Sequence, residues 1–106
     1  DQDQGRDGAV FAPFFGIPTA TLTALSRLAQ LTGAVVIPAQ AKQLPWGQGY
    51  ELIFQPPLEN FPTEDVLADT TRMNKIIEDA VREMPEQYFW SHRRFKTRPE
   101  GEKPFY

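Results

Sequence analysis

Apolar residues in the first third of the chain form a short run and then a helical repeat. Residues 9–15 read AVFAPFF, and Pro13 limits this run to an edge or irregular strand because proline cannot donate a ladder hydrogen bond. Over residues 19–31, Leu22, Leu25, Leu28 and Ala29 recur every three to four positions. This spacing predicts a helix with one buried face, which Gly33 ends as its C-terminal cap.

A β-branched run and a proline- and glycine-rich turn follow. Residues 34–39 read AVVIPA, and a continuous apolar run of this kind is typical of a strand buried on both faces. Residues 41–49 (AKQLPWGQG) predict a turn, and residues 50–57 (YELIFQPP) predict a second strand, in a hairpin or an adjacent pair. A helix, a glycine cap and a buried strand in this order indicate an α/β fold.

The longest helical pattern begins after Pro62. Thr63 is the predicted N-cap, and Glu64 and Asp65 are placed where carboxylates favour the helix dipole. The predicted buried face carries Val66, Met73, Ile76, Ile77, Ala80, Val81 and Met84. We expect the charged residues of the other face to be solvated, as is usual for such a face: Asp69, Arg72, Lys75, Glu78, Asp79, Arg82 and Glu83.

Proline and glycine shape the C-terminal end. Pro85 ends the long helix and can begin a short one that contains residues 86–92. Beyond Phe95, further proline and glycine residues predict an irregular basic tail over residues 96–106.

Length and composition narrow the class of protein. At 106 residues, with 41% hydrophobic and 24% charged residues, the chain suits one modest folded domain. Cysteine is absent, which excludes disulfides and thiolate metal sites, and no apolar stretch approaches the length of a membrane span. The chain opens with DQDQGRD rather than methionine, so we expect it to be a piece of a longer protein.

Charge is distributed unevenly. The net charge of -3 argues against a wholly basic nucleic-acid binder, yet five bases face two acids between Arg93 and Lys103. Arg93, Arg94, Lys96 and Arg98 suggest anion binding, because arginine matches phosphate bidentately and the neighbouring aromatics supply an apolar footing. The alternative is that these residues only complement the end of a helix.

His92, the single histidine, invites a catalytic assignment. The nearby carboxylates Glu86 and Glu100 do not share an obvious helical face with it, so we expect a structural histidine that packs beside Trp90. Metal binding is not expected, because one histidine, no cysteine and scattered acids give no ligand spacing.

Residues 84–101, MPEQYFWSHRRFKTRPEG, resemble the C-terminal signature of the bacterial lipid A biosynthesis acyltransferases, the late lauroyl and myristoyl transferases of the lysophospholipid acyltransferase superfamily. Other segments resemble the second half of that family in the same order: DQDQGRDGAVFAPFFGIPTAT, LAQLTGAVVIP, YELIFQPPLE and TTRMNKIIEDAV. The resemblance therefore covers essentially the whole chain.

This resemblance implies an O-acyltransferase that moves a fatty acyl group from acyl carrier protein to a hydroxyl of a phosphorylated glucosamine lipid, without metal or cofactor, at the cytoplasmic face of the bacterial inner membrane. The family's catalytic motif is HxxxxD or HxxxxE, whereas the residue five positions after His92 is Thr97. We therefore expect residues 1–106 to be the C-terminal part of one acyltransferase domain, a partial sheet with flanking helices, which has no catalytic residue and is inactive alone.

The resemblance also implies which residues contact substrate. Asp1, Gln2 and Asp3, followed by the FFG of residues 14–16, occupy the place of a substrate motif in related glycerolipid acyltransferases. The basic residues of the tail can meet the lipid phosphate or the acidic carrier protein. The expected substrate-contacting set is therefore Asp1, Gln2, Asp3, Arg93, Arg94, Lys96 and Arg98.

Two further hypotheses remain. A stand-alone, non-catalytic module could use its basic aromatic tail for RNA or acidic partners, although the net negative charge opposes this reading. A fragment of an α/β sheet also exposes strand edges, so the chain is a candidate for dimerisation.

Overall fold

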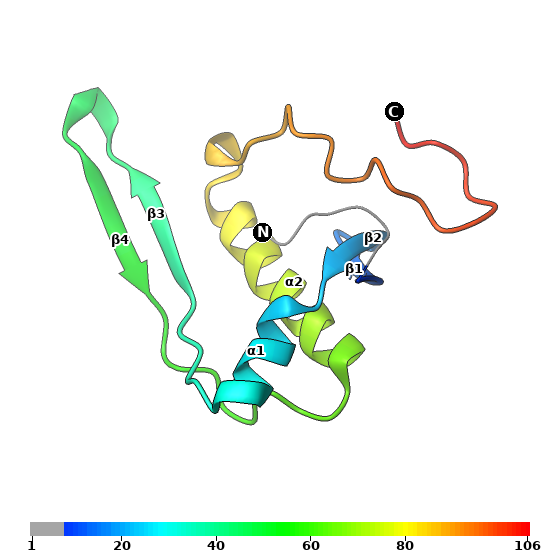
Figure 1. The fold of residues 1–106 in the computed structure, drawn as a ribbon. Helices are drawn as coiled ribbons and strands as arrows, with labels where there is room; N and C mark the ends of the chain where they lie inside the picture. The colour runs from blue at the N-terminus through cyan, green and yellow to red at the C-terminus, as the bar shows by residue number, and fades with distance from the viewer. Residues whose placement is uncertain (1–7) are drawn as a thin grey trace.

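The chain forms two β-hairpins and two α-helices in the computed structural model, which describes residues 8–106 (Figure 1). The elements are β1 (Ala9–Phe14), β2 (Ile17–Leu22), α1 (Ala24–Thr32), β3 (Ala39–Gln43), β4 (Tyr50–Phe54) and α2 (Val66–Glu83), with short 3₁₀ turns η1 (Pro45–Gly47) and η2 (Pro85–Gln87). β1 pairs with β2 and β3 with β4, both antiparallel. The fold is mixed α/β, as the sequence predicts.

The strand predicted over residues 9–15 is confirmed as β1, but residues 19–22, predicted to be helical, belong to a second strand, β2, which pairs with β1 as a hairpin. Ala9 pairs with Leu22 at one end and Phe14 with Ile17 at the tip. The hydroxyls of Thr19 and Thr21 donate to backbone carbonyls two residues earlier, at 2.7 and 2.9 Å. Such local bonds compete with helix formation, and β-branched residues pack well in strands, so α1 begins only at Ala24.

The prediction of a buried strand over residues 34–39 is wrong. Residues 34–38 are irregular, and Val35 and Ile37 are 70% and 50% exposed. The carbonyls of Val36 and Pro38 accept hydrogen bonds from Leu58 and Gln55, so one edge of the segment is paired. The strand lies at β3 instead, and it pairs with β4 to form the predicted hairpin. A strand buried on both faces needs a layer on each side, which the described residues do not supply.

α2 begins two residues later than predicted. Its N-cap is Asp65, whose side chain accepts a hydrogen bond from the Ala68 N–H at 3.0 Å. Gly33 ends α1 in the left-handed conformation, at φ 70°, as predicted. After α2, Pro85 begins a short helix as predicted, but this is the single 3₁₀ turn η2 and ends at Gln87, so its predicted extent to residue 92 is wrong. The segment from Lys96 to the C-terminus is irregular as predicted.

The core lies where the β1–β2 hairpin packs on α2. Its apolar residues are Ala12, Phe14, Ala20, Ala29, Val81 and Phe95. Asp69 and Glu78 are buried with them, at 2% and 9% exposure, so the prediction of a solvated charged face is wrong for these two residues. It is confirmed for the other five, which are exposed: Arg72, Lys75, Asp79, Arg82 and Glu83.

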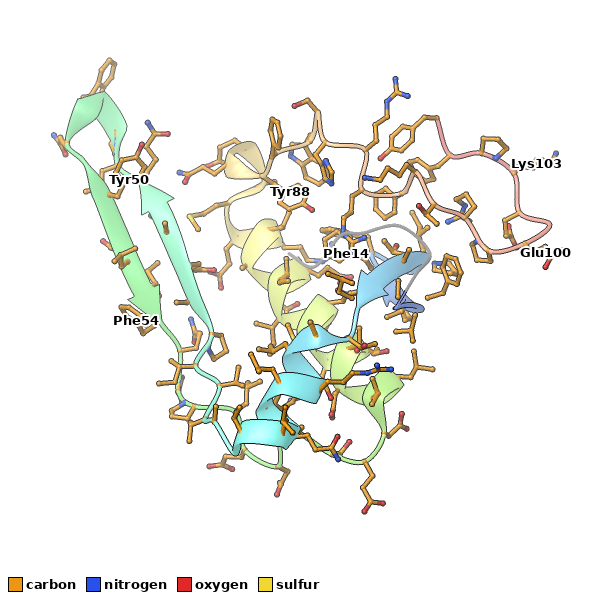
Figure 2. All side chains as sticks on the ribbon, viewed as in Figure 1. Phe14, Tyr50, Phe54, Tyr88, Glu100 and Lys103 are labelled. Carbon is orange, nitrogen blue, oxygen red and sulfur yellow. The ribbon has the colours of Figure 1, made fainter. Side chains whose placement is uncertain are left out.

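The molecule is open rather than spherical. Its radius of gyration is 15.0 Å, against about 13 Å for a compact domain of this length. The β3–β4 hairpin projects away from the helices, and Tyr50 and Phe54 lie along it (Figures 1 and 2). None of the helices in residues 8–106 has the length and apolar character needed to cross a bilayer.

Candidate functional site

The tip of the β1–β2 hairpin is fixed on α2 through Glu78. Phe15 and Gly16 both have positive φ, 51° and 75°, the backbone of a tight two-residue hairpin turn. The Phe15 N–H donates to Glu78 Oε1, and the guanidinium of Arg82 lies 4.8 Å from the centre of the Phe15 ring. A side chain other than glycine is therefore held in a left-handed turn by a carboxylate of the facing helix.

Glu78 stays charged in this setting. Burial alone would raise the pKa of Glu78, but the hydrogen bond from the Phe15 N–H and the charges of Lys75 and Arg82 lower it below the ordinary value of 4.5. Lys75 Nζ and Arg82 Nη2 lie 3.4 and 3.5 Å from Glu78 Oε2.

Asp69 forms a second buried carboxylate network. Ser26 of α1 donates its hydroxyl at 2.7 Å, and Thr63 donates both its backbone N–H and its hydroxyl. Burial alone would raise the pKa of Asp69, but these hydrogen bonds, with a smaller contribution from Arg72, lower it below the ordinary value of 3.8. Asp69 thereby ties α1 and the segment before α2 to the helix.

Thr21 is the centre of a third network, which joins three parts of the chain. Its Oγ1 accepts hydrogen bonds from Asn74 Nδ2 of α2 at 3.1 Å and from Arg94 Nη2 at 3.0 Å. Arg94 Nη1 also donates to the Ala20 carbonyl at 2.7 Å. All of these side chains are buried, so β2, α2 and the C-terminal segment meet at one hydroxyl.

The structure divides the four basic residues of the C-terminal segment into two pairs. Arg94 is 2% exposed. Arg98, whose side chain is 15% exposed, donates to the Pro18 carbonyl at 3.0 Å and lies 3.7 Å from Glu102. Arg93 and Lys96 are exposed, and the Arg93 guanidinium lies 5.7 Å from the centre of the Tyr106 ring.

The N-terminal part of the expected site, Asp1, Gln2 and Asp3, lies outside the described residues. The chain that follows these residues enters β1 at Ala9.

His92 is partly exposed, and its ring stacks on Phe89 with centres 6.4 Å apart and planes 8° apart. Trp90 turns elsewhere: its Nε1 donates to the Pro85 carbonyl at 2.6 Å and its ring contacts Tyr88 and Phe15. The aromatic ring that stacks on His92 is thus Phe89, and the packing of His92 beside Trp90 stays a prediction. Within residues 8–106, no group of three or more acidic or histidine side chains could hold a metal ion.

An open apolar groove lies between α2 and the β3–β4 hairpin. It has a volume of about 730 Å³. It is lined by residues 36–41, which lead into β3, by residues that follow β4, and by the apolar face of α2. That face is only partly covered, whereas four polar residues elsewhere on α2 are buried: Asp69, Thr70, Asn74 and Glu78. The lining includes Val36, Ile37, Met73, Ile76, Ile77 and Met84.

Sequence reasoning missed Asn74, Thr21 and the buried state of Glu78 and Asp69. A signal was present: Thr70, Asn74, Glu78 and Val81 recur every three to four residues and so share one face of α2. Short polar side chains in such a stripe suit a packed polar interface better than a solvated one, because they lack the long charged heads that reach water.

Comparison with known proteins shows which family this fold and these residues represent. The family model for bacterial lipid A biosynthesis acyltransferase matches residues 1–97. The lipid A biosynthesis lauroyltransferase of Escherichia coli K12 is 43% identical over 102 residues, which cover 95% of this chain and 33% of the relative. The palmitoleoyltransferase of the same strain is 44% identical over 107 residues, covering 100% of this chain and 35% of the relative.

A third relative from the same strain, the lipid A biosynthesis myristoyltransferase, is 36% identical over 104 residues, which cover 96% of this chain and 32% of the relative. The chain thus spans about a third of the length of these curated relatives. Because the family match covers nearly all of it, the chain belongs to the bacterial lipid A biosynthesis acyltransferase family.

Proposed function

We propose that this chain is the C-terminal part of an acyltransferase domain that moves a fatty acyl group from acyl carrier protein to a hydroxyl of a phosphorylated lipid A precursor. The observation that carries the proposal is the family match over residues 1–97. The relatives' names, lauroyl-, palmitoleoyl- and myristoyltransferase, support transfer of a fatty acyl group. The whole enzyme would work at the cytoplasmic face of the bacterial inner membrane, where its lipid acceptor is held.

The chemical step is assigned to the part of the enzyme outside this chain. Transfer to a hydroxyl needs a general base within hydrogen-bond reach of the acceptor oxygen, and a carboxylate to orient that base. His92 stacks on Phe89, and Thr97 follows where the family motif needs an acid. We therefore assign no catalytic residue here, and the chain alone is proposed to be inactive.

The part of the site proposed for this chain is electrostatic. Arg93 and Lys96 are exposed on the C-terminal segment, and Asp1, Gln2 and Asp3 precede β1. We assign the two exposed cations to an anionic partner, either the phosphate of the lipid acceptor or the acidic carrier protein. Asp1, Gln2 and Asp3 are assigned to the lining of the acceptor site.

The open groove supports the proposal that the domain is incomplete in this chain. Apolar side chains of α2 and of residues 36 and 37 line a volume of about 730 Å³, and an unfilled apolar groove of this size is unfavourable in water. The remaining two thirds of the enzyme would cover it. When the chain is isolated, a second copy is the proposed substitute, which makes a dimer.

A hybrid enzyme tests the electrostatic part. In it, this chain replaces the matching third of the Escherichia coli lauroyltransferase. Arg93→Glu with Lys96→Glu should raise the KM of the anionic partner about tenfold or more. Lys42→Glu, an exposed position on the distant β3, is the matched control.

The readout separates the two partners. A rise in KM for the phosphorylated acceptor, absent with a dephosphorylated acceptor, identifies the lipid phosphate, whereas a rise in the KM for acyl carrier protein identifies the donor. If the folded double variant keeps both KM values at the parent level, the electrostatic assignment is wrong.

A further inference from the structure

The tip of the β3–β4 hairpin presents a large aromatic side chain to solvent. Trp46 of η1 has the left-handed backbone conformation, at φ 58°, in a turn that the Leu44 N–H closes by donating to the Gly49 carbonyl at 2.8 Å. Trp46 is 94% exposed, although tryptophan is highly buried on average. A residue other than glycine in this conformation is also unfavourable, so both features point to a role at the surface.

The end of this hairpin lies beside η2. Gln43, the last residue of β3, donates its N–H to Gln87 Oε1 at 2.8 Å and accepts a hydrogen bond from Gln87 Nε2 at 3.1 Å. Tyr50 pairs with Gln43 across the hairpin and is 71% exposed, and Phe89, which follows η2, is 72% exposed. Two adjoining segments thus form an aromatic edge, which we define by Trp46, Tyr50 and Phe89.

The aromatic edge is separate from the open groove. Its three residues are not among those that line the groove, so an occupant of the groove does not by itself cover the edge. The hairpin tip, η2 and the C-terminal segment lie along one side of the molecule, opposite the loops that lead into β3 and α2 (Figure 1). Figure 2 shows Tyr50 and Tyr88, the neighbour of Phe89, on this side.

Charge differs between these two sides of the molecule. Over residues 86–96 the exposed charged residues are Glu86, Arg93 and Lys96, so the exposed charge there is net positive. The loop of residues 55–65, on the opposite side in Figure 1, exposes three acids and contains no lysine or arginine. An anionic surface attracts the first side and repels the second, which favours one orientation of the chain.

We propose that the aromatic edge docks this chain on an anionic lipid bilayer. The rings of Trp46, Tyr50 and Phe89 enter the headgroup region, which favours amphipathic aromatic side chains. Arg93 and Lys96 contact the lipid phosphates. A bilayer fits this surface better than a protein partner does, because the rings project singly from two segments, whereas the energetically dominant residues of protein interfaces cluster in well-packed pockets. The proposal goes beyond the proposed function, since it needs neither the acyl acceptor nor the carrier protein.

Sedimentation of the chain with lipid vesicles tests the proposal. The vesicles are phosphatidylcholine alone, or phosphatidylcholine with phosphatidylglycerol as the anionic lipid. The parent chain should bind the anionic vesicles, and Trp46→Ala should weaken this binding about tenfold, because one large aromatic side chain no longer leaves water. Leu31→Ala, at an 85% exposed apolar position on α1, is the matched control and should bind as the parent does.

A charge variant tests the contact with lipid phosphates. Arg93→Gln with Lys96→Gln should weaken binding to the anionic vesicles about tenfold or more, and should change binding to phosphatidylcholine vesicles by less than about twofold. The substituted side chains are exposed, so circular dichroism should show parent secondary structure in this variant and in Trp46→Ala.

Tryptophan fluorescence locates the aromatic edge relative to the bilayer. The chain has two tryptophans, so Trp90→Phe leaves Trp46 as the single reporter. With anionic vesicles, its emission should shift to shorter wavelength and should be quenched by lipids that carry bromine in the upper part of the acyl chain.

Several results would overturn the proposal: no binding to anionic vesicles, parent-level binding by Trp46→Ala or by the charge variant, an equal loss in Leu31→Ala, or unchanged emission of Trp46. Binding of single-stranded polyuridylate by a chain that ignores vesicles would overturn it too, and would make the edge a base-stacking surface.

These outcomes are distinct from those of the proposed function. Vesicle binding as stated, together with parent KM values for the Arg93 and Lys96 variant of the hybrid enzyme, would remove the assignment of these cations to acceptor or carrier protein and leave bilayer docking in place. Raised KM values without vesicle binding would do the reverse.

Discussion

Two buried carboxylates on α2 hold neighbouring segments by their backbone N–H groups. Asp69 accepts from the Thr63 N–H and Glu78 from the Phe15 N–H. Each also accepts from side chains, so the cost of burying its charge is offset by hydrogen bonds that are stronger than those between neutral groups. At the scale of single residues, α2 therefore anchors two neighbouring loops through its buried carboxylates, in addition to packing in the core.

Asp69→Asn should destabilise the chain by about 2 kcal/mol, because it weakens hydrogen bonds made to a buried charge and replaces an acceptor with donors. Urea unfolding followed by circular dichroism measures the change. Asp79 is the matched control, because its side chain is 58% exposed and forms an ion pair with Lys75 at 2.9 Å. Asp79→Asn should cost less than about 0.5 kcal/mol. Equal effects of the two substitutions would contradict the role given to Asp69.

Stability should fall on acidification in a window set by the same two residues. The pKa values of Asp69 and Glu78 are lowered on folding below 3.8 and 4.5, so the unfolded state takes up protons first as the pH falls. Their stabilisation is complete above those values and is lost as the pH falls through the lower folded-state pKa values. The unfolding free energy of the parent chain should therefore fall between pH 7 and pH 3, and this fall should be smaller in the double variant Asp69→Asn/Glu78→Gln. An equally steep fall in the double variant would refute this.

At the scale of elements, the sequence predicts correctly those strands, helices and caps that depend on residues close together in the chain. The strand run at β1, the Gly33 cap, the β4 run and the helical repeat of α2 are all confirmed. Residues 19–22 were misassigned because leucine spacing favoured a helix while threonine hydroxyl bonding and pairing with β1 favoured a strand. Helical periodicity located α2. It could not show that the β1–β2 hairpin packs on the side of α2 that carries Asn74 and Glu78, rather than on the side that carries Ile76 and Ile77.

The start of α2 offers a prediction at this scale. Asp65 caps the helix through the Ala68 N–H, whereas Glu64 is exposed and precedes the cap. Asp65→Ala should therefore lower stability by about 1 kcal/mol, and Glu64→Ala should change it by only a few tenths. Thermal unfolding followed by the circular dichroism of the helices compares the two variants. A larger loss for Glu64→Ala would move the cap away from Asp65.

At the scale of the whole molecule, the chain contains one side of a core and leaves the other open. Asn74 and Glu78 of α2 are buried against the β1–β2 hairpin, while the apolar lining of the groove and the segment of residues 34–38 are only partly covered. This explains why AVVIPA looks like a buried strand in the sequence but is irregular here: its pattern suits a second layer of structure. The candidate site is divided in the same way, because the exposed cations could be found from sequence and the hairpin anchors could not.

The isolated chain should self-associate through this open face. Light scattering coupled to size-exclusion chromatography should find a dimer at concentrations of about 100 μM, since covering the groove removes apolar surface from water. Ile37→Lys, at the groove, should shift the chain toward monomer, whereas Leu31→Lys, an 85% exposed position outside the groove, should not. A stable monomer of the parent chain at that concentration would rule out self-association.

The central claim, that this chain is the non-catalytic part of a lipid A acyltransferase domain, is tested most directly by measuring acyl transfer. Mass spectrometry would follow transfer from acyl carrier protein to the phosphorylated lipid acceptor by the isolated chain and by the hybrid with the Escherichia coli lauroyltransferase. The account predicts transfer by the hybrid and none by the chain alone. Transfer by the isolated chain, or a folded hybrid that binds both substrates but transfers nothing, would contradict it.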